Sequence, residues 1–368
     1  MHLAASHQIG RRRVGLRIAA AAAVLALSAA CGSSDSTNTS SAAPGAKTAD
    51  VAFVIPFTGI AFMQHQQAGA EAAAAEDPRI KLRVVAGSKP DPAAEVKLFT
   101  DAIASGAKGV VVMPLAPPLF SRAFADADRK GIPLATVTIR QEPTSPGIYV
   151  GESEYDAVRP AMRYLADKIG SDAKGKVVLG ICSKGTGILE ERIDGAKRYL
   201  AEYLPNVQVV GPFEGAQEPG KSFAAWQSIV SSNPDALAFI GSCPFDGDSL
   251  VKLRKSNPNA RWVAGTVGIG PEILASIRSG DLLFGTDEVE FARGYVAVKR
   301  VAAALLDGRK QLEPGWVDTG ATLVTRENVD ETEKRYNATG AEAVTLFKEF
   351  IDKGMKSAPQ PYSALKPS

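Results

Sequence analysis

Residues 215–222 read GAQEPGKS and fit the phosphate-loop pattern G-x-x-x-x-G-K-S of nucleotide-binding proteins. A nucleotide hydrolase also needs an acidic side chain at the end of a neighbouring strand to hold magnesium. The next strand-like run, ALAFIG, ends at Ser242 instead, and Pro219 has no backbone N–H to donate to a phosphate. We therefore interpret the segment as a polar loop that leads into a helix starting at Ser222.

Histidine is scarce in this chain, which limits the chemistry available to it. His2 and His7 lie in an N-terminal export segment, so only His65 remains in the mature chain. A Ser-His-Asp or Cys-His site would depend on that one residue. The sequence has no His/Cys cluster with metal-ligand spacing and no acidic calcium loop. These absences favour a binding protein over an enzyme and predict no catalytic residue, metal or cofactor.

Cys182 and Cys243 each follow a strand-like run in the second half of the chain. In a doubly wound sheet these two strands lie side by side, so the two Cα atoms can come within the roughly 4.4–6.8 Å that a disulfide spans. An exported compartment permits such a bond. A disulfide and a pair of small buried thiols both remain open as interpretations.

The N-terminus has the composition of an export signal. Four arginines between residues 11 and 17 precede an apolar run at residues 18–27, which is shorter than the roughly 20 residues of a membrane span. Small residues 28–30 then lead to Cys31. Removing residues 1–30, which carry four arginines and no acidic residue, changes the formal charge from +2 to 2 − 4 = −2. A mature chain of this charge argues against nucleic acid as a partner.

Cys31 resembles the lipidated cysteine of a bacterial lipobox. We expect residues 1–31 to be a lipoprotein signal that ends in this cysteine. Residues 32–49 are small and polar and predict a flexible tether. Leu27 lies one place further from the cysteine than in the commonest pattern, and Ser28 takes its place. Ordinary cleavage nearby, which would release a freely soluble protein, is the alternative.

From residue 51 onward, short apolar runs alternate with longer amphipathic stretches, which predicts repeated β-α-β units. Such units form a parallel sheet with helices on both faces. The pattern runs once to about residue 137 and then restarts, so we expect an α/β protein with two units of similar build. A ligand site in such units lies beyond the carboxyl ends of the strands.

Four stretches carry a resemblance to a known family: GVVVMPLAP (109–117), KGIPLATV (130–137), ERIDGAKRYL (191–200) and NPDALAFIG (233–241). In this order, behind a lipoprotein signal, they resemble the type I periplasmic binding proteins of sugar importers, which are ribose-binding-protein-like. The resemblance implies two doubly wound parallel-sheet lobes joined by a three-strand hinge, with a ligand cleft between them. On it, residues 50–148 plus 289–318 form the N-terminal lobe, and residues 149–288 plus 319–368 form the C-terminal lobe.

The resemblance also implies ligand-binding residues. Phe62 aligns best with the aromatic position after the first strand, and Met63 is a second candidate. Arg140 and Gln141 follow the fourth strand, where the family often places an acid next to the arginine; that acid is missing here. Arg192, in the ERIDG segment, matches an arginine that binds ligand in many relatives. The alternatives are a core role for Phe62 and a solvated helix position for Arg192.

Two departures from the family pattern affect the expected ligand. Where relatives usually show Asn-Asp, the sequence has Cys243, Pro244, Phe245 and Asp246, of which Phe245 and Asp246 are our candidates for ligand contacts. Relatives carry an acid where this chain has Thr266 and Val267. Glu288 or Glu290, near a hinge, can supply a replacement acceptor. The ligand therefore need not be a common pentose or hexose.

The resemblance implies an extracytoplasmic receptor of an ABC importer that binds a small polar ligand, a sugar or sugar derivative, between two closing lobes. We expect it to act as a monomer, to meet an ABC permease, and to be held on the outer face of the cell membrane by the lipid on Cys31. A sensory receptor of the same fold that signals to a membrane protein is one alternative. An importer receptor for a non-sugar small solute is another.

Overall fold

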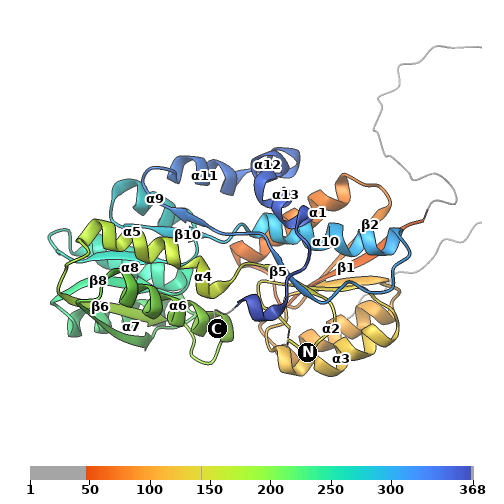
Figure 1. Ribbon diagram of the computed structural model, residues 1–368, viewed down its shortest axis with the longest axis horizontal. Helices are drawn as coiled ribbons and strands as arrows, with labels where there is room; N and C mark the ends of the chain where they lie inside the picture. Colours follow the sequence, from red (N-terminus) through yellow and green to blue (C-terminus); the bar gives the residue numbers. More distant parts are fainter. Residues whose placement is uncertain (1–46, 142, 366–368) are drawn as a thin grey trace, which may run out of the picture. The chain divides into compact units, whose positions relative to one another are not determined.

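The computed structural model describes residues 47–141 and 143–365 (Figure 1). The predicted signal, Cys31 and most of the predicted tether lie outside these residues. Within the described part of the chain, no helix combines the length and apolar character needed to cross a membrane.

The first lobe is built on a six-stranded parallel sheet with the strand order β11-β5-β4-β3-β1-β2. In its interior strand β1, ADVAFVI, six of seven residues are buried, as expected of a parallel strand covered on both faces. The strands are β1 (Ala49–Ile55), β2 (Ile80–Ala86), β3 (Gly109–Val112), β4 (Leu134–Val137), β5 (Ile148–Gly151) and β11 (Gly315–Asp318).

Helices cover both faces of this sheet. On one face α2 (Pro92–Ala104) and α3 (Pro117–Arg129) contribute Phe99, Phe120 and Phe124 to the core. On the other face α1 (Ala61–Ala75) packs against α10 (Glu290–Leu306). The two helices touch through glycines, because a Cβ at Gly69 would lie 1.9 Å from the carbonyl oxygen of Phe291. This close approach places the start of α10 beside the middle of α1.

The second lobe has a four-stranded parallel sheet with the order β7-β6-β8-β9. Its strands are β6 (Gly175–Ile181), β7 (Val207–Glu214), β8 (Ala236–Gly241) and β9 (Val263–Thr266), and its helices are α5 (Arg159–Ile169), α6 (Gly187–Tyr203), α7 (Pro219–Ser232), α8 (Pro244–Ser256) and α9 (Pro271–Ser279). We predicted that this helix starts at Ser222, but α7 begins three residues earlier, at Pro219. Proline suits the first position of a helix. Ser222 is buried, and its hydroxyl donates to the carbonyl of Phe245 at 3.0 Å.

The chain passes between the lobes three times. After β5 it enters the second lobe through the short helix α4 (Glu154–Ala157), and it returns between β10 (Gly285–Asp287) and α10. After β11 it leaves again to form β12 (Thr322–Val324), which pairs antiparallel with β10. The first two passages place residues 152–154 and 288–290 at the junction of the lobes.

The C-terminal segment differs from our prediction that residues 319–368 belong to the second lobe. Helix α11 (Val329–Asn337) packs against α9, but α12 (Gly340–Leu346) and α13 (Lys348–Lys356) pack on α1 and α10 of the first lobe (Figure 1). Phe347 and Ile351 are buried in the first-lobe core, and the Phe347 ring stacks on Phe291 with centroids 5.0 Å apart. The assignment is therefore wrong for residues 340–356, because the apolar residues of this segment pack on α1 and α10.

Candidate functional site

Arg192 lies on α6 and is 4% exposed, so the alternative of a solvated helix arginine is wrong. Its Nε donates to Glu154 at 2.6 Å, one terminal nitrogen donates to the carbonyl of Ser242 at 3.0 Å, and the other pairs with Glu288. Burial opposes its charge, but the charges of Glu154 and Glu288 outweigh this and raise the pKa of Arg192. The guanidinium therefore joins α6, the end of β8 and two hinge passages.

A second buried arginine, Arg293 on α10, lies at the same junction and is fully buried. It donates to Glu290 at 3.0 Å and to the Thr138 hydroxyl at 3.1 Å, and it pairs with Glu152. Burial lowers the pKa of Arg293 to about 10, which still leaves it charged at neutral pH. Arg293 is not among the predicted site residues; its signal in the sequence is a charged residue inside the apolar helical run FARGYVAV.

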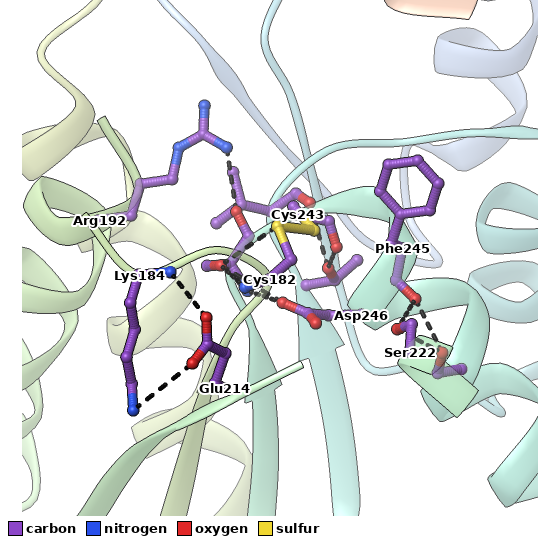
Figure 2. The surroundings of a disulfide bond; sticks show 12 residues. Cys182, Lys184, Arg192, Glu214, Ser222, Cys243, Phe245 and Asp246 are labelled. Carbon is purple, nitrogen blue, oxygen red and sulfur yellow. Dashed lines mark hydrogen bonds and ion pairs between the residues drawn. A yellow bond between two sulfur atoms is a disulfide. The ribbon is translucent and has the colours of Figure 1, made fainter. Parts of the chain in front are cut away.

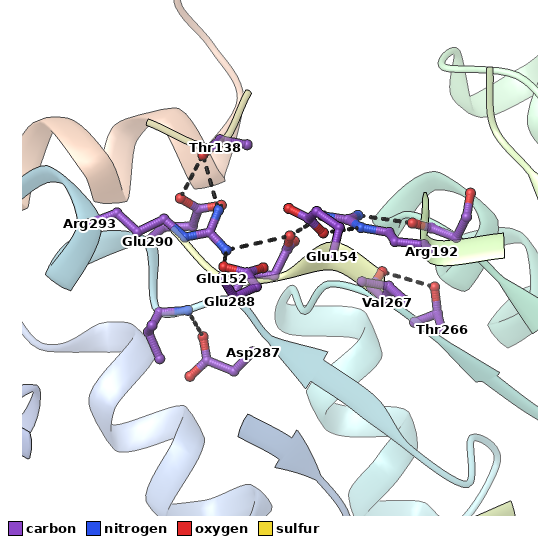
Figure 3. Close-up of polar contacts among 12 residues, drawn as sticks. Thr138, Glu152, Glu154, Arg192, Thr266, Val267, Asp287, Glu288, Glu290 and Arg293 are labelled. Carbon is purple, nitrogen blue, oxygen red and sulfur yellow. Dashed lines mark hydrogen bonds and ion pairs between the residues drawn. The ribbon is translucent and has the colours of Figure 1, made fainter. Parts of the chain in front are cut away.

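The two arginines and four glutamates form what we call the hinge cluster: Glu152, Glu154, Arg192, Glu288, Glu290 and Arg293. Figure 3 shows Glu152, Glu154 and Glu288 between Arg293 on one side and Arg192 on the other, with Glu290 beside Arg293. Burial raises the pKa of Glu154 to about 7 and also raises the pKa values of Glu288 and Glu290. The cluster thus offers carboxylate acceptors and guanidinium donors at the lobe junction, which suits the binding of a polar molecule. Of these residues, our sequence analysis named Arg192, Glu288 and Glu290.

Thr138 and Gln66 connect this cluster to the first lobe. Gln66 on α1 donates its amide to both Thr138 and Glu290, and the Thr138 hydroxyl lies 3.2 Å from Glu290. Thr138 has a φ of 58° and Val289 a φ of 49°, a left-handed conformation that is unfavourable for β-branched residues. Such strain concentrates at functional sites, where the surrounding contacts hold it in place.

Arg140 forms a two-pronged ion pair with Glu191 of α6, with one N–O distance of 2.7 Å. Burial opposes the charge of Arg140, but Glu191 raises its pKa. The acid that the family places beside this arginine is missing from the first lobe, and Glu191 supplies it from the second lobe. This pair is therefore a direct polar contact between the lobes, and a role of Arg140 in ligand binding stays a prediction.

Three other predicted residues face the protein interior. Met63 is 3% exposed and belongs to the first-lobe core. Gln141 accepts from Thr136 and donates to the hydroxyl of Tyr362 at 2.6 Å. Asp246 is fully buried and accepts from the Trp226 indole at 2.7 Å and from the backbone N–H of Ser242 at 2.9 Å. These side chains support the folded lobes, so the structure does not bring them into the hinge cluster.

The two predicted aromatic residues are partly buried. Phe62 at the start of α1 packs against the first-lobe core, and Phe245 at the start of α8 packs against the second-lobe core. Both helices begin at carboxyl ends of parallel strands, where family ligands are expected. A ligand contact for either ring stays a prediction.

Cys182 and Cys243 form a disulfide with a Cα–Cα distance of 6.3 Å (Figure 2). Their strands β6 and β8 are neighbours in the sheet, as we expected. Cys182 lies directly after β6, and Cys243 lies directly before α8. The backbone carbonyl of the adjacent Ser242 accepts a hydrogen bond from Arg192. The disulfide therefore supports the backbone that positions one side of the hinge cluster.

Comparisons with known proteins agree with this architecture. The sequence model of the family described as periplasmic binding protein domain matches residues 51–310. The ribose import binding protein of Haemophilus influenzae is 26% identical to this chain over 218 residues, which cover 53% of this chain and 71% of that protein.

Solved structures of solute-binding proteins share the fold. One is an ABC transporter solute binding protein from Burkholderia graminis in complex with D-arabinose. Its TM-score is 0.69 at 20% sequence identity, and the match covers 76% of this chain and 96% of that chain. A periplasmic ribose ABC transporter structure from Conexibacter woesei has a TM-score of 0.68 at 19% identity, covering 78% and 95%. The chain thus has the expected fold of two doubly wound lobes connected by hinge passages.

Proposed function

Because the chain belongs to the periplasmic binding protein domain family, we propose that it is an extracytoplasmic receptor that captures a small polar solute for an ABC importer. The observation that carries this proposal is the hinge cluster, in which buried donors and acceptors from both lobes meet at one junction. The names of the relatives, which mention ribose and D-arabinose, support a sugar or sugar derivative as the solute. The receptor acts by binding and release, without chemistry on the solute.

The receptor is held at the outer face of the cell membrane by a lipid on Cys31. The support for this anchor is the sequence pattern alone: an apolar run, small residues, a cysteine and a polar tether. The receptor presents its solute to a permease as a monomer.

A thermal-shift screen over neutral sugars, amino sugars and polyols tests the function. A ligand present at 100 times its Kd stabilises the folded state by about 2.7 kcal/mol, which is readily detected. A hit should be followed by uptake measurements in cells with and without the gene. A tight-binding solute whose uptake does not depend on the gene would contradict the importer role.

A further inference from the structure

The hinge cluster contains more acidic than basic groups. Its four carboxylates face two guanidiniums, which leaves 4 − 2 = 2 negative charges in excess when all six are ionised. Burial and neighbouring carboxylates oppose that state and raise the pKa values of Glu154, Glu288 and Glu290. Neighbouring charges do not make up the difference. Arg140 is paired with Glu191, and Arg335 lies 2.8 Å from Asp287. The described residues around the cluster therefore supply no additional cation.

Two carboxylate oxygens in the cluster also have no hydrogen-bond partner among the described residues. They are one oxygen of Glu152, which is 4% exposed, and one of Glu154, which is 1% exposed. Carboxylate oxygens of Glu152, Glu154 and Glu288 lie within 4.8 Å of one another (Figure 3). Leaving buried carboxylate oxygens without partners is costly unless the groups are protonated, so hydrogen-bond donors of a bound solute would stabilise their ionised form.

We propose that the solute carries a protonated primary amine, and that its ammonium group lies between Glu152, Glu154 and Glu288. This inference rests on the proposed receptor function and narrows its ligand to amino sugars or other small polar amines. An ammonium brings three N–H donors and one positive charge. A neutral hydroxyl can donate to one of these oxygens but brings no positive charge to favour their ionised form.

A metal ion fits the same oxygens less well. Calcium takes six to eight oxygen ligands and magnesium demands octahedral geometry, usually with several waters. Here Arg192 and Arg293 already occupy one oxygen each of Glu154 and Glu152, and Glu288 is paired with Arg192. The two guanidiniums would also repel a divalent ion more strongly than a singly charged ammonium. An ammonium needs no such coordination shell, because its three N–H groups can donate to the oxygens that the arginines leave unpaired.

Calorimetry with matched ligand pairs tests the proposal on the whole mature protein. The pairs are D-glucosamine with D-glucose and D-galactosamine with D-galactose; putrescine serves as an amine without a sugar, and calcium chloride as a metal. We expect at least one amine to bind at least tenfold more tightly than its neutral partner, or putrescine to bind where no neutral sugar does. Glu152→Gln and Glu154→Gln should each weaken amine binding tenfold or more.

Glu214→Gln is the matched control, because Glu214 is an exposed second-lobe carboxylate paired with Lys184. It should leave every affinity unchanged. If either cluster variant fails to fold, the other variant and the wild-type pairs decide the matter. Equal or tighter binding of the neutral sugars overturns the amine inference and leaves the receptor function standing. Binding of calcium alone, or of no amine, also overturns it. Putrescine binding without any sugar upholds the amine and removes the sugar from the proposed function.

Discussion

At the residue scale, the burial of Arg192 changes what its removal should do. A solvated arginine can be truncated at little cost, but this one lies between Glu154 and Glu288. Buried ion pairs are weak evidence for stability, yet removing one partner leaves the other charge buried without compensation. Arg192 therefore serves both the fold and the proposed site, and its two roles have to be separated by experiment.

We expect Arg192→Ala to lower the free energy of unfolding by about 3–5 kcal/mol, the scale seen when one partner of a buried pair is lost. Urea denaturation of the purified variant measures this. The double variant Arg192→Ala with Glu154→Gln should lose less than Arg192→Ala alone, because it removes one of the carboxylates that the first change leaves unpaired. Additive losses in the double variant would show that the pair is not coupled.

At the element scale, the packing around a helix decides whether a charged side chain on it stabilises or destabilises the folded state. Helix α2 brings Glu95 into the first-lobe core, where it is fully buried and accepts one hydrogen bond, from the backbone N–H of Leu115 at 3.0 Å. Its other oxygen has no partner among the described residues. Burial raises the pKa of Glu95 to about 8.

This position makes a pH-dependent contribution to stability. Between the ordinary value of 4.5 and about 8, the folded carboxyl holds a proton that the unfolded chain has released. The contribution is therefore fully present below about pH 4.5 and is lost as the pH rises through about 8. Glu95→Gln should gain stability relative to wild type as the pH rises, by roughly 1–3 kcal/mol at pH 8.

Urea denaturation of both proteins at pH 5 and pH 8 measures that difference. Glu71→Gln, on the exposed face of α1, is the matched control for a carboxylate changed to an amide. A stability difference between Glu95→Gln and wild type that is the same at both pH values would contradict the expectation.

We expect the disulfide that joins the ends of β6 and β8 to be present in the exported protein. Cys182 and Cys243 should resist alkylation under non-reducing conditions and react after reduction, as followed by mass spectrometry. The bond closes a loop with a sequence separation of 61, so replacing both cysteines with serine should cost about 2–4 kcal/mol. Two free thiols in protein purified from the exported fraction would show that the bridge is not formed.

At the scale of the whole molecule, residues that are distant in sequence meet because the chain crosses three times between its lobes. A solute held by both lobes contacts both only when they are closed, so binding should shift the population toward a closed form. We expect the radius of gyration from X-ray scattering to decrease when a tight-binding solute is added. A non-binding variant should show no change, and an unchanged radius in the saturated wild type would contradict hinge closure.

Membrane retention should depend on Cys31. Replacing Cys31 with serine removes the thiol that the lipid requires, so the mature protein should move from the membrane fraction to the soluble fraction. Quantitative immunoblotting of both fractions measures this, with Cys182→Ser as a control that keeps the N-terminal cysteine. Retention of the Cys31 variant at the wild-type level would show that the lipid anchor is wrong.

The sequence by itself determined the α/β class, the two units and the proximity of Cys182 and Cys243. Apolar runs and helical periodicity are local properties, and parallel strand order follows from a small set of rules. The fold named by the resemblance is confirmed, and Arg192 and Glu288 were picked out together with it.

Only the tertiary structure decided which charged groups meet. Glu152 and Glu154 come from one hinge passage, and Glu290 and Arg293 come from the helix that follows another, so no local pattern relates the first pair to the second. No local pattern relates Arg140 to Glu191 either. The apolar residues of helices α12 and α13 can be recognised in the sequence, but the sequence does not show that these helices pack on the first lobe. Side-chain pairing and the docking of a terminal segment depend on contacts across long sequence separations. One sequence specifies these contacts only through the complete fold.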